Sequence, residues 1–187
     1  TDGHRLAMIS RPVKSNSKTD EVLTFLLPKK ALSELLKLME DDDAKMGFSS
    51  QENHLAFICG KQIIVSRKID GKFPNYRQVI PSDNTLKAKA GKGDLTSALK
   101  RVALLADEKS KMVRFEIKKG SLTLVSDNTD LGAANEELAI EYDGEEVSIG
   151  LNAKYVLDIL SAIEGDFVTL NLKDQNHSCL FTVADDD

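Results

Sequence analysis

The chain has 187 residues, of which 41% are hydrophobic and 29% charged, and its formal charge at pH 7 is −5. This composition is ordinary for a soluble globular protein of one large or two small domains, and no apolar run approaches the length of a membrane span. The net charge argues against nonspecific wrapping of nucleic acid by the whole surface, although one basic face remains compatible with it.

The first third of the chain predicts strands around a single helix. Pro28 opens the helix, since proline is tolerated in a first turn, and the acidic run 41–43 ends it. Gly60 and Lys61 form a tight turn between two strands. The predicted strands of this part are 22–27, 45–50, 54–59 and 62–69.

The segment 70–81 is irregular, and the polar stretch after Pro81 marks the predicted boundary between a domain at 1–81 and a domain at 82–187. The second domain contains two helices, at 94–106 and at 153–164, and the later one begins after Asn152 as its N-cap. Residues 118–120 read as a hairpin turn. The predicted strands are 85–90, 112–117, 121–125, 133–142, 146–150, 166–173 and 178–183.

The three predicted helices match one another at intervals of about sixty residues, which indicates a repeated unit. Each carries four apolar residues at spacings that place them on one helix face. These residues are Leu32, Leu35, Leu36 and Met39, then Leu95, Ala98, Leu99 and Val102, then Val156, Ile159, Leu160 and Ile163. Such a repeat predicts units standing side by side in a symmetric or ring-like scaffold, and it argues against an enzyme with one unique cleft.

The strands alternate between apolar and polar residues, as Val113, Phe115 and Ile117 illustrate. Sheets of this kind bury one face, and the helices must cover that face. The predicted fold class is therefore α+β with antiparallel sheets.

Cationic side chains recur on the helix faces that point away from the sheets, where Glu34 and Asp158 also lie. Equivalent helices that present such groups could form a continuous positive track, which would hold phosphates through charge without reading bases. The candidate DNA-facing residues are Lys29, Lys30, Lys37, Lys92, Lys100, Arg101 and Lys154.

Two other function classes are open at this point. Cys59 and Cys179 are expected to be reduced thiols in or near the core of a cytosolic protein. A Cys–His hydrolase would require Cys59 and His4 to be in contact. The sequence contains neither a phosphate-binding loop nor a dinucleotide-binding glycine pattern, so we expect no enzyme, no metal and no cofactor. A protein-interaction scaffold of repeated units without a DNA role is the main alternative.

Segments 1–6 and 73–80 combine turn residues with apolar and cationic groups, which suits a groove for a peptide. The alternative is that Pro74, Tyr76 and Val79 only brace a domain junction.

Three motifs resemble the bacterial sliding clamps, the beta subunits of DNA polymerase III: TDGHRLA at 1–7, DGKFPNYRQVIP at 70–81 and IGLNAKYVLDIL at 149–160. The resemblance implies three domains of two units each in the full protein. Two such chains would close head to tail around duplex DNA, with helices lining the hole and sheets outside. This chain would supply the second half of the middle domain and most of the last domain. Because it also lacks an initial Met, we expect it to be part of a longer chain.

The resemblance also implies the partners and the residues that bind them. The replicative polymerase and the clamp loader would bind through short peptide motifs in a groove between the middle and last domains, with no catalysis by the clamp. The implied groove residues are Thr1, Gly3, His4, Arg5, Leu6, Pro74, Arg77, Gln78, Val79, Asn152, Tyr155 and Ser178. The implied DNA contacts are Lys29 and Lys30.

Some features depart from the family. Gln78 stands where some members have Arg, and Ser110 stands where others have an aromatic residue. Members end in a hydrophobic strand that contributes to the groove, whereas this sequence ends in an acidic run at 185–187, so we expect an incomplete groove. Leu104 and Leu105 cannot both lie on the apolar stripe of their helix, and in the family this helix end meets a second chain. We expect this chain alone to be a monomer or a weak dimer.

Overall fold

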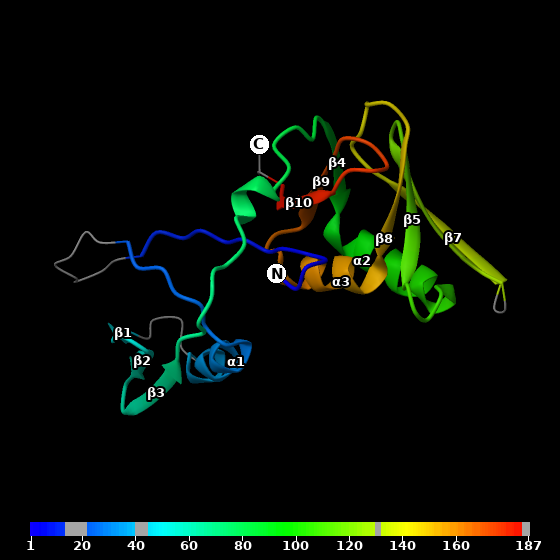
Figure 1. The fold of residues 1–187 in the computed structure, drawn as a ribbon. Coiled ribbons are helices and arrows are strands. Elements are labelled where there is room, and N and C mark those ends of the chain that lie inside the picture. The colour runs from blue at the N-terminus through cyan, green and yellow to red at the C-terminus, as the bar shows by residue number, and fades with distance from the viewer. Residues whose placement is uncertain (14–21, 40–44, 130–131, 185–187) are drawn as a thin grey trace. The chain divides into compact units, whose positions relative to one another are not determined.

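The computed structural model describes residues 1–13, 22–39, 45–129 and 132–184. The chain divides into two compact units, one formed by Ala7–Tyr76 and the other by Thr1–Leu6 together with Arg77–Asp187. Figure 1 shows the elements of each unit. The acidic runs at 41–43 and 185–187 lie outside the described residues. The prediction that the run 41–43 ends the first helix therefore stays a prediction.

The described residues of the unit Ala7–Tyr76 form one helix and one antiparallel sheet in the order β1-β2-β3. Its elements are α1 (Lys29–Leu38), β1 (Met46–Ser50), β2 (His54–Cys59) and β3 (Gln62–Arg67). The small core consists of Leu35, Leu55 and Phe57, against which Phe25, Leu27 and Ile64 pack. Gly60 adopts a positive φ of 58° in the turn between β2 and β3, which glycine tolerates because it lacks a Cβ atom.

The strand predicted at 22–27 is wrong. Residues 22–27 form no strand. One backbone hydrogen bond to this segment is described, and it runs from the N–H of Ile69 to the carbonyl of Leu26 at 3.1 Å. A strand needs a repeating ladder with a neighbour, and β3 ends at Arg67, before the chain reaches this contact.

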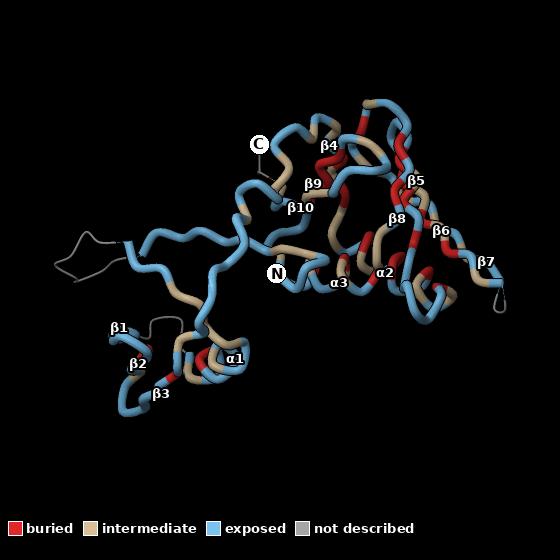
Figure 2. Tube along the Cα trace, viewed as in Figure 1, coloured by how far each residue is buried: buried red, intermediate tan, exposed pale blue. Residues whose placement is uncertain are grey.

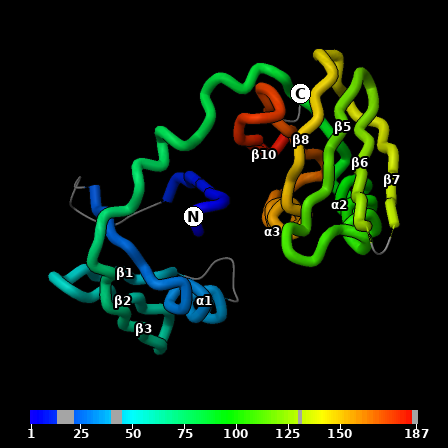
Figure 3. The backbone as a smooth tube through the Cα atoms, turned by 45° about the vertical axis from the view of Figure 1, so that its right-hand side comes forward, coloured from blue at the N-terminus to red at the C-terminus, as the bar shows by residue number. Residues whose placement is uncertain are grey.

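In the other unit, the part of the chain that the structure describes forms two α-helices and two antiparallel sheets, ordered β10-β9-β4 and β7-β6-β5-β8. Figure 3 shows the four strands of the second sheet as neighbours. The elements are η1 (Tyr76–Gln78, at the boundary between the units), β4 (Leu86–Gly91), α2 (Lys92–Val102), η2 (Ala103–Leu105), β5 (Met112–Lys118), β6 (Ser121–Asn128), β7 (Gly132–Ala139), β8 (Val147–Asn152), α3 (Ala153–Ala162), β9 (Phe167–Leu172) and β10 (Leu180–Val183).

Helix α2 contacts α3 and strands of both sheets, so one core spans the whole unit. The alternation predicted from sequence is confirmed, because Val113, Phe115 and Ile117 are all buried. Figure 2 shows buried residues along β5, β6, β8 and β9 and in both helices. The predicted α+β class with antiparallel sheets is thereby confirmed.

Several predicted elements have different ends, and two of them change how the unit is described. The helix predicted at 94–106 begins at Lys92 and changes to a 3-10 turn at Ala103. The strand predicted at 133–142 leaves its partner β6 after Ala139, and Glu141 then exchanges two backbone hydrogen bonds with Lys89 of β4. This bridge joins the two sheets, a non-local pairing that a local alternation pattern does not reveal. The hairpin turn predicted at 118–120 is confirmed, with Gly120 at a φ of 73°.

None of the helices in the described part of the chain has the length and hydropathy of a membrane span.

Candidate ligand-binding site

The first residues fold into a turn closed by its own polar groups. The Asp2 carboxylate accepts the backbone N–H groups of His4 and Arg5, each at 3.1 Å. The Thr1 hydroxyl donates to the carbonyl of Arg5 at 2.7 Å and accepts the N–H of Gly3 at 3.2 Å. Gly3 has a φ of 89°, a conformation that side chains with a Cβ rarely adopt. The backbone N–H of His4 is the largest of the effects that lower the pKa of Asp2 to about 2.

Asn152 fixes the start of α3. Its side-chain oxygen accepts the N–H of Tyr155 at 3.2 Å, and its side-chain nitrogen donates to the carbonyl of Ser110 at 2.8 Å. The predicted N-cap is therefore confirmed. The N–H of Ala153 also donates to the carbonyl of Lys111, which ties the loop before β5 to this helix start. Both polar atoms of Asn152 are used within the chain.

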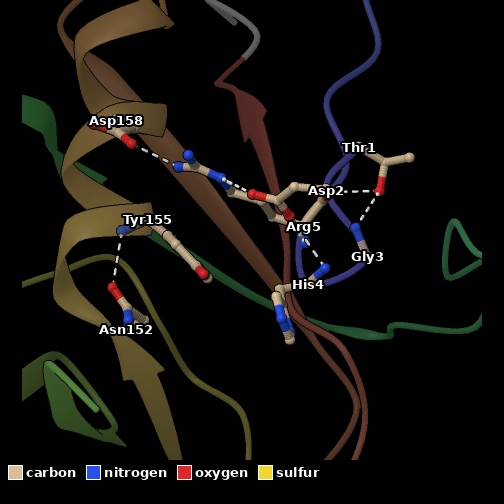
Figure 4. A network of polar contacts seen from close by, with 8 residues as sticks. All are labelled: Thr1, Asp2, Gly3, His4, Arg5, Asn152, Tyr155 and Asp158. Carbon is tan, nitrogen blue, oxygen red and sulfur yellow. Dashed lines mark hydrogen bonds and ion pairs between the residues drawn. The ribbon is translucent and has the colours of Figure 1, made fainter. Parts of the chain in front are cut away.

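Arg5 connects the N-terminal turn to α3, as Figure 4 shows. Its Nη1 donates to Asp158 at 2.6 Å, its Nε donates to Asp2 at 3.1 Å, and its guanidinium carbon lies 4.4 Å from the centre of the Tyr155 ring. A cation at this distance from an aromatic face is attracted by the ring. The hydrogen bond from Arg5 to Asp158 is the main cause that raises the pKa of Arg5.

Asp2 and Asp158 were not among the candidate site residues. Asp158 follows Tyr155 by three positions on a helix, which places both side chains on neighbouring parts of one face. Asp2 precedes Gly3 in a turn, where Asp commonly accepts backbone N–H groups. These local signals exist, but only the folded chain shows that both carboxylates meet Arg5.

The predicted groove residues differ in how closely they are connected. Thr1, Gly3, His4, Arg5, Asn152 and Tyr155 come together, with Leu6 half-buried directly after them. Arg77, Gln78 and Val79 belong to the same unit, and among the described contacts no hydrogen bond or ion pair joins them to Arg5. The carbonyl of Ser178 accepts a hydrogen bond from Asn84 at 3.0 Å. Pro74 lies in the unit Ala7–Tyr76.

The predicted DNA-facing cations differ in what they contact. Lys29, Lys30, Lys100 and Lys154 are exposed. Lys92 is half-buried and donates to the carbonyl of Ile163 at 2.9 Å, which joins the start of α2 to the residue that ends α3. The two remaining cations are in ion pairs: Lys37 with Glu34 at 2.9 Å, and Arg101 with Glu136 through two bonds of 2.5 and 2.6 Å.

The two thiols have different surroundings in the folded chain. Cys59 donates weakly from Sγ to the carbonyl of Leu38 at 3.5 Å, and burial raises the pKa of Cys179 to about 12. Cys59 and His4, the residues of the Cys–His alternative, belong to different units. Within the described residues there is no cluster of three or more potential metal ligands.

Two family models together match almost the entire chain. The C-terminal domain of the DNA polymerase III beta subunit matches residues 77–187, and the central domain of that subunit matches residues 1–75. The beta sliding clamp of Pseudomonas aeruginosa is 33% identical over the whole chain, which aligns with 50% of that relative. The beta sliding clamp of Escherichia coli K12 is 33% identical over 93% of the chain and 47% of the relative.

A solved structure of a sliding clamp from Pseudomonas aeruginosa, bound to griselimycin, has a TM-score of 0.88 at 30% identity. The match covers 94% of this chain and 47% of that one. The chain thus spans about half the length of the relatives that it matches.

Proposed function

The chain belongs to the family of bacterial beta sliding clamps, the beta subunits of DNA polymerase III, and on this premise we propose that it forms about half of a DNA sliding clamp. The observation that carries the proposal is the match of the central and C-terminal clamp domains, in order, along the chain. In the full protein, two copies close into a ring around duplex DNA in the bacterial cytoplasm. The ring holds the replicative polymerase on its template and performs no chemical step.

The exposed lysines support a DNA-facing role for part of the predicted set. Lys29, Lys30, Lys100 and Lys154 have exposed side chains, from which an ammonium group can reach a phosphate. Lys92 already donates to a backbone carbonyl, and Arg101 is held by Glu136. We therefore assign the main electrostatic contact to these four lysines, which are exposed and form no ion pair among the described contacts, unlike Lys37. Contacts of this kind hold the sugar–phosphate backbone and are independent of base sequence.

The cluster of Arg5, Asn152 and Tyr155 supports the peptide-binding role. It offers an aromatic ring at the start of a helix, beside a turn that its own hydrogen bonds hold in place. Aromatic and apolar groups of this kind receive the side chains of short peptide motifs. We assign this cluster to the partner groove.

The exposed end of α2 supports a contact between copies of the full protein. The side chain of Leu104 is 76% exposed in the 3-10 turn after α2, whereas the neighbouring Leu105 is half-buried. In the family this helix end meets a second chain, and an exposed apolar side chain at that place would be buried in the contact. We assign Leu104 and Leu105 to the dimer interface of the complete ring.

The test uses the full-length protein loaded onto nicked circular DNA. Lys29→Glu with Lys30→Glu should reduce the amount of clamp retained, and the slope of the logarithm of binding against the logarithm of salt should fall by about one for each lost phosphate contact. We further propose that griselimycin, which is bound in the solved Pseudomonas aeruginosa clamp, binds at the Arg5 cluster. Its binding should then be unchanged by these substitutions, because they leave that cluster intact. Tyr155→Ala and Leu6→Ala should instead weaken griselimycin binding and leave the amount of clamp retained on DNA unchanged.

Each outcome decides between the alternatives. If the lysine variants load and slide like the wild type, the DNA-facing assignment is wrong. A wild-type protein that binds the polymerase but is not retained on circular DNA would instead support the interaction scaffold. Loss of griselimycin binding in the lysine variants would show that they disturb the fold or that the two sites have been confused.

A further inference from the structure

The N-terminal turn and α3 are distant in sequence. Among the described polar side chains of the turn, that of Arg5 joins it to the helix. The hydrogen bonds of Thr1 and Asp2 remain inside the turn. Arg5 alone among these residues donates to α3, through its 2.6 Å bond to Asp158. Among the described polar and ring contacts, the docking of this turn on the helix therefore depends on the ion pair of Arg5 with Asp158 and on the contact of Arg5 with the ring of Tyr155.

The charges around Arg5 are not those of a free cationic site. One guanidinium meets two carboxylates, those of Asp2 and Asp158, so the three groups together carry a net negative charge. The face of the Tyr155 ring also receives the guanidinium. A carboxylate of an incoming ligand would have to compete with both acids and would meet their repulsion.

The N-cap of α3 and two side chains of the helix follow one another in sequence. Asn152 caps the helix and accepts the N–H of Tyr155, and Asp158 follows Tyr155 by one helical turn. The backbone of Tyr155 is thus held from its N-terminal side, whereas its ring is held by the guanidinium that Asp158 places above it. Side chains that hold a binding group in one orientation raise affinity because less freedom is lost on binding.

We propose that Asp158 is a positioning residue of the ligand site: its ion pair with Arg5 docks the N-terminal turn on α3 and holds the guanidinium over the Tyr155 ring. Arg5 then orders the site instead of pairing with a carboxylate of the ligand. This inference rests on the proposed function, in which the Arg5 cluster belongs to the partner groove. It changes the role expected for Arg5 and adds Asp158, which the sequence pattern placed only on a solvated helix face.

The test is a double-mutant cycle in the full chain, with griselimycin as the probe. Arg5→Ala and Asp158→Ala should each weaken binding by about tenfold, and the double variant should bind about as weakly as either single variant, because the second substitution acts on a pair that is already broken. Asp158→Glu keeps the carboxylate and should restore binding to within about twofold of wild type. Asp143→Asn removes the same charge from an exposed turn of the same unit and should leave binding unchanged.

A second readout needs no ligand. Asp158→Asn should speed hydrogen exchange of the amides of His4 and Arg5, since the turn loses its docking contact, whereas the amides of β5 should exchange as in the wild type. Unchanged far-ultraviolet circular dichroism and thermal unfolding of the variant will show that the core is intact.

The outcomes separate this inference from the proposed function. If wild type fails to bind griselimycin but Asp158→Asn speeds exchange of the turn, the assignment of the ligand site is wrong, and only the docking of the turn by Asp158 holds. If the wild type binds and the fold loss of affinity in the double variant equals the product of the two single fold losses, Arg5 and Asp158 act independently. The positioning role is then wrong. Wild-type exchange and affinity in Asp158→Asn would also overturn it.

Discussion

Leu36 of α1 and Leu99 of α2 occupy equivalent positions on two matching helices, yet 73% of Leu36 is exposed and 0% of Leu99. Helix α2 packs against α3 and against strands of two sheets. In the unit Ala7–Tyr76, the described elements are one helix and one three-stranded sheet. The same apolar stripe is therefore fully buried in α2, whereas in α1 only Leu35 of its four residues is buried.

This difference predicts unequal effects on stability. Leu99→Ala should lower the free energy of unfolding of its unit by about 2–5 kcal/mol, because it removes a fully buried side chain and leaves a cavity. Leu36→Ala should change the free energy of unfolding of this chain by about 0.5 kcal/mol or less, as for other exposed positions. Urea unfolding followed by circular dichroism measures both, and equal losses would contradict the burial seen in the structure.

Asn152 should be sensitive to the group that replaces its amide. Asn152→Ala removes the N-cap of α3 and should lower stability by about 1 kcal/mol. Asn152→Asp keeps an acceptor for the N–H of Tyr155 but loses the donor to the carbonyl of Ser110, so its melting temperature should lie between those of wild type and Asn152→Ala. If Asp and Ala variants melt together, the tie to Ser110 is the interaction that matters.

The N-terminal turn should loosen in acid. The pKa of Asp2 is lowered from 3.8 to about 2 in the folded chain, so its contribution to the turn is complete above pH 3.8 and is lost as the pH falls through about 2. Carbon-13 resonances of the Asp2 carboxyl group report this titration directly. Asp2→Asn should show a loosened turn, measured by amide exchange of His4, at every pH; a midpoint near 3.8 would show that the described hydrogen bonds do not persist in solution.

Cys179 should resist alkylation while the chain is folded. Burial raises the pKa of its thiol from 9.0 to about 12, and only the thiolate reacts at an appreciable rate. In a Cys59→Ser variant, which leaves Cys179 as the only thiol of the chain, iodoacetamide at pH 8 should label the protein only after urea is added. Rapid labelling of the native variant, monitored by mass spectrometry, would contradict the burial of this side chain.

Local patterns were sufficient for much of the fold. The alternation in 112–117 predicted the buried side of β5, and Asn152 before an apolar helix predicted the N-cap of α3. Both features depend on residues within a few positions of one another, where spacing decides which side chains share a face. The segment 22–27 shows the limit of this approach, since its apolar composition suits a strand but a strand also needs a partner along its length.

The candidate site was predictable in part for the same reason. The motif at 1–7 and the helix start at Asn152 and Tyr155 carry the family resemblance in short stretches of sequence. The DNA-facing set was less predictable, because Lys92 and Arg101 lie on suitable helix positions but the fold offers them a carbonyl and a carboxylate. A helix position determines the direction of a side chain, and only its tertiary surroundings determine which acceptor it meets.

The sequence by itself determined the repeated helices, the antiparallel α+β class and the family of this chain, because periodicity and short motifs are local properties. Only the tertiary structure decided that Arg5 pairs with Asp158, 153 positions away, and that Leu99 is buried while Leu36 is not. Ion pairs and burial depend on which surfaces the folded chain brings together. That information lies in contacts between distant residues and is absent from the spacing of neighbours.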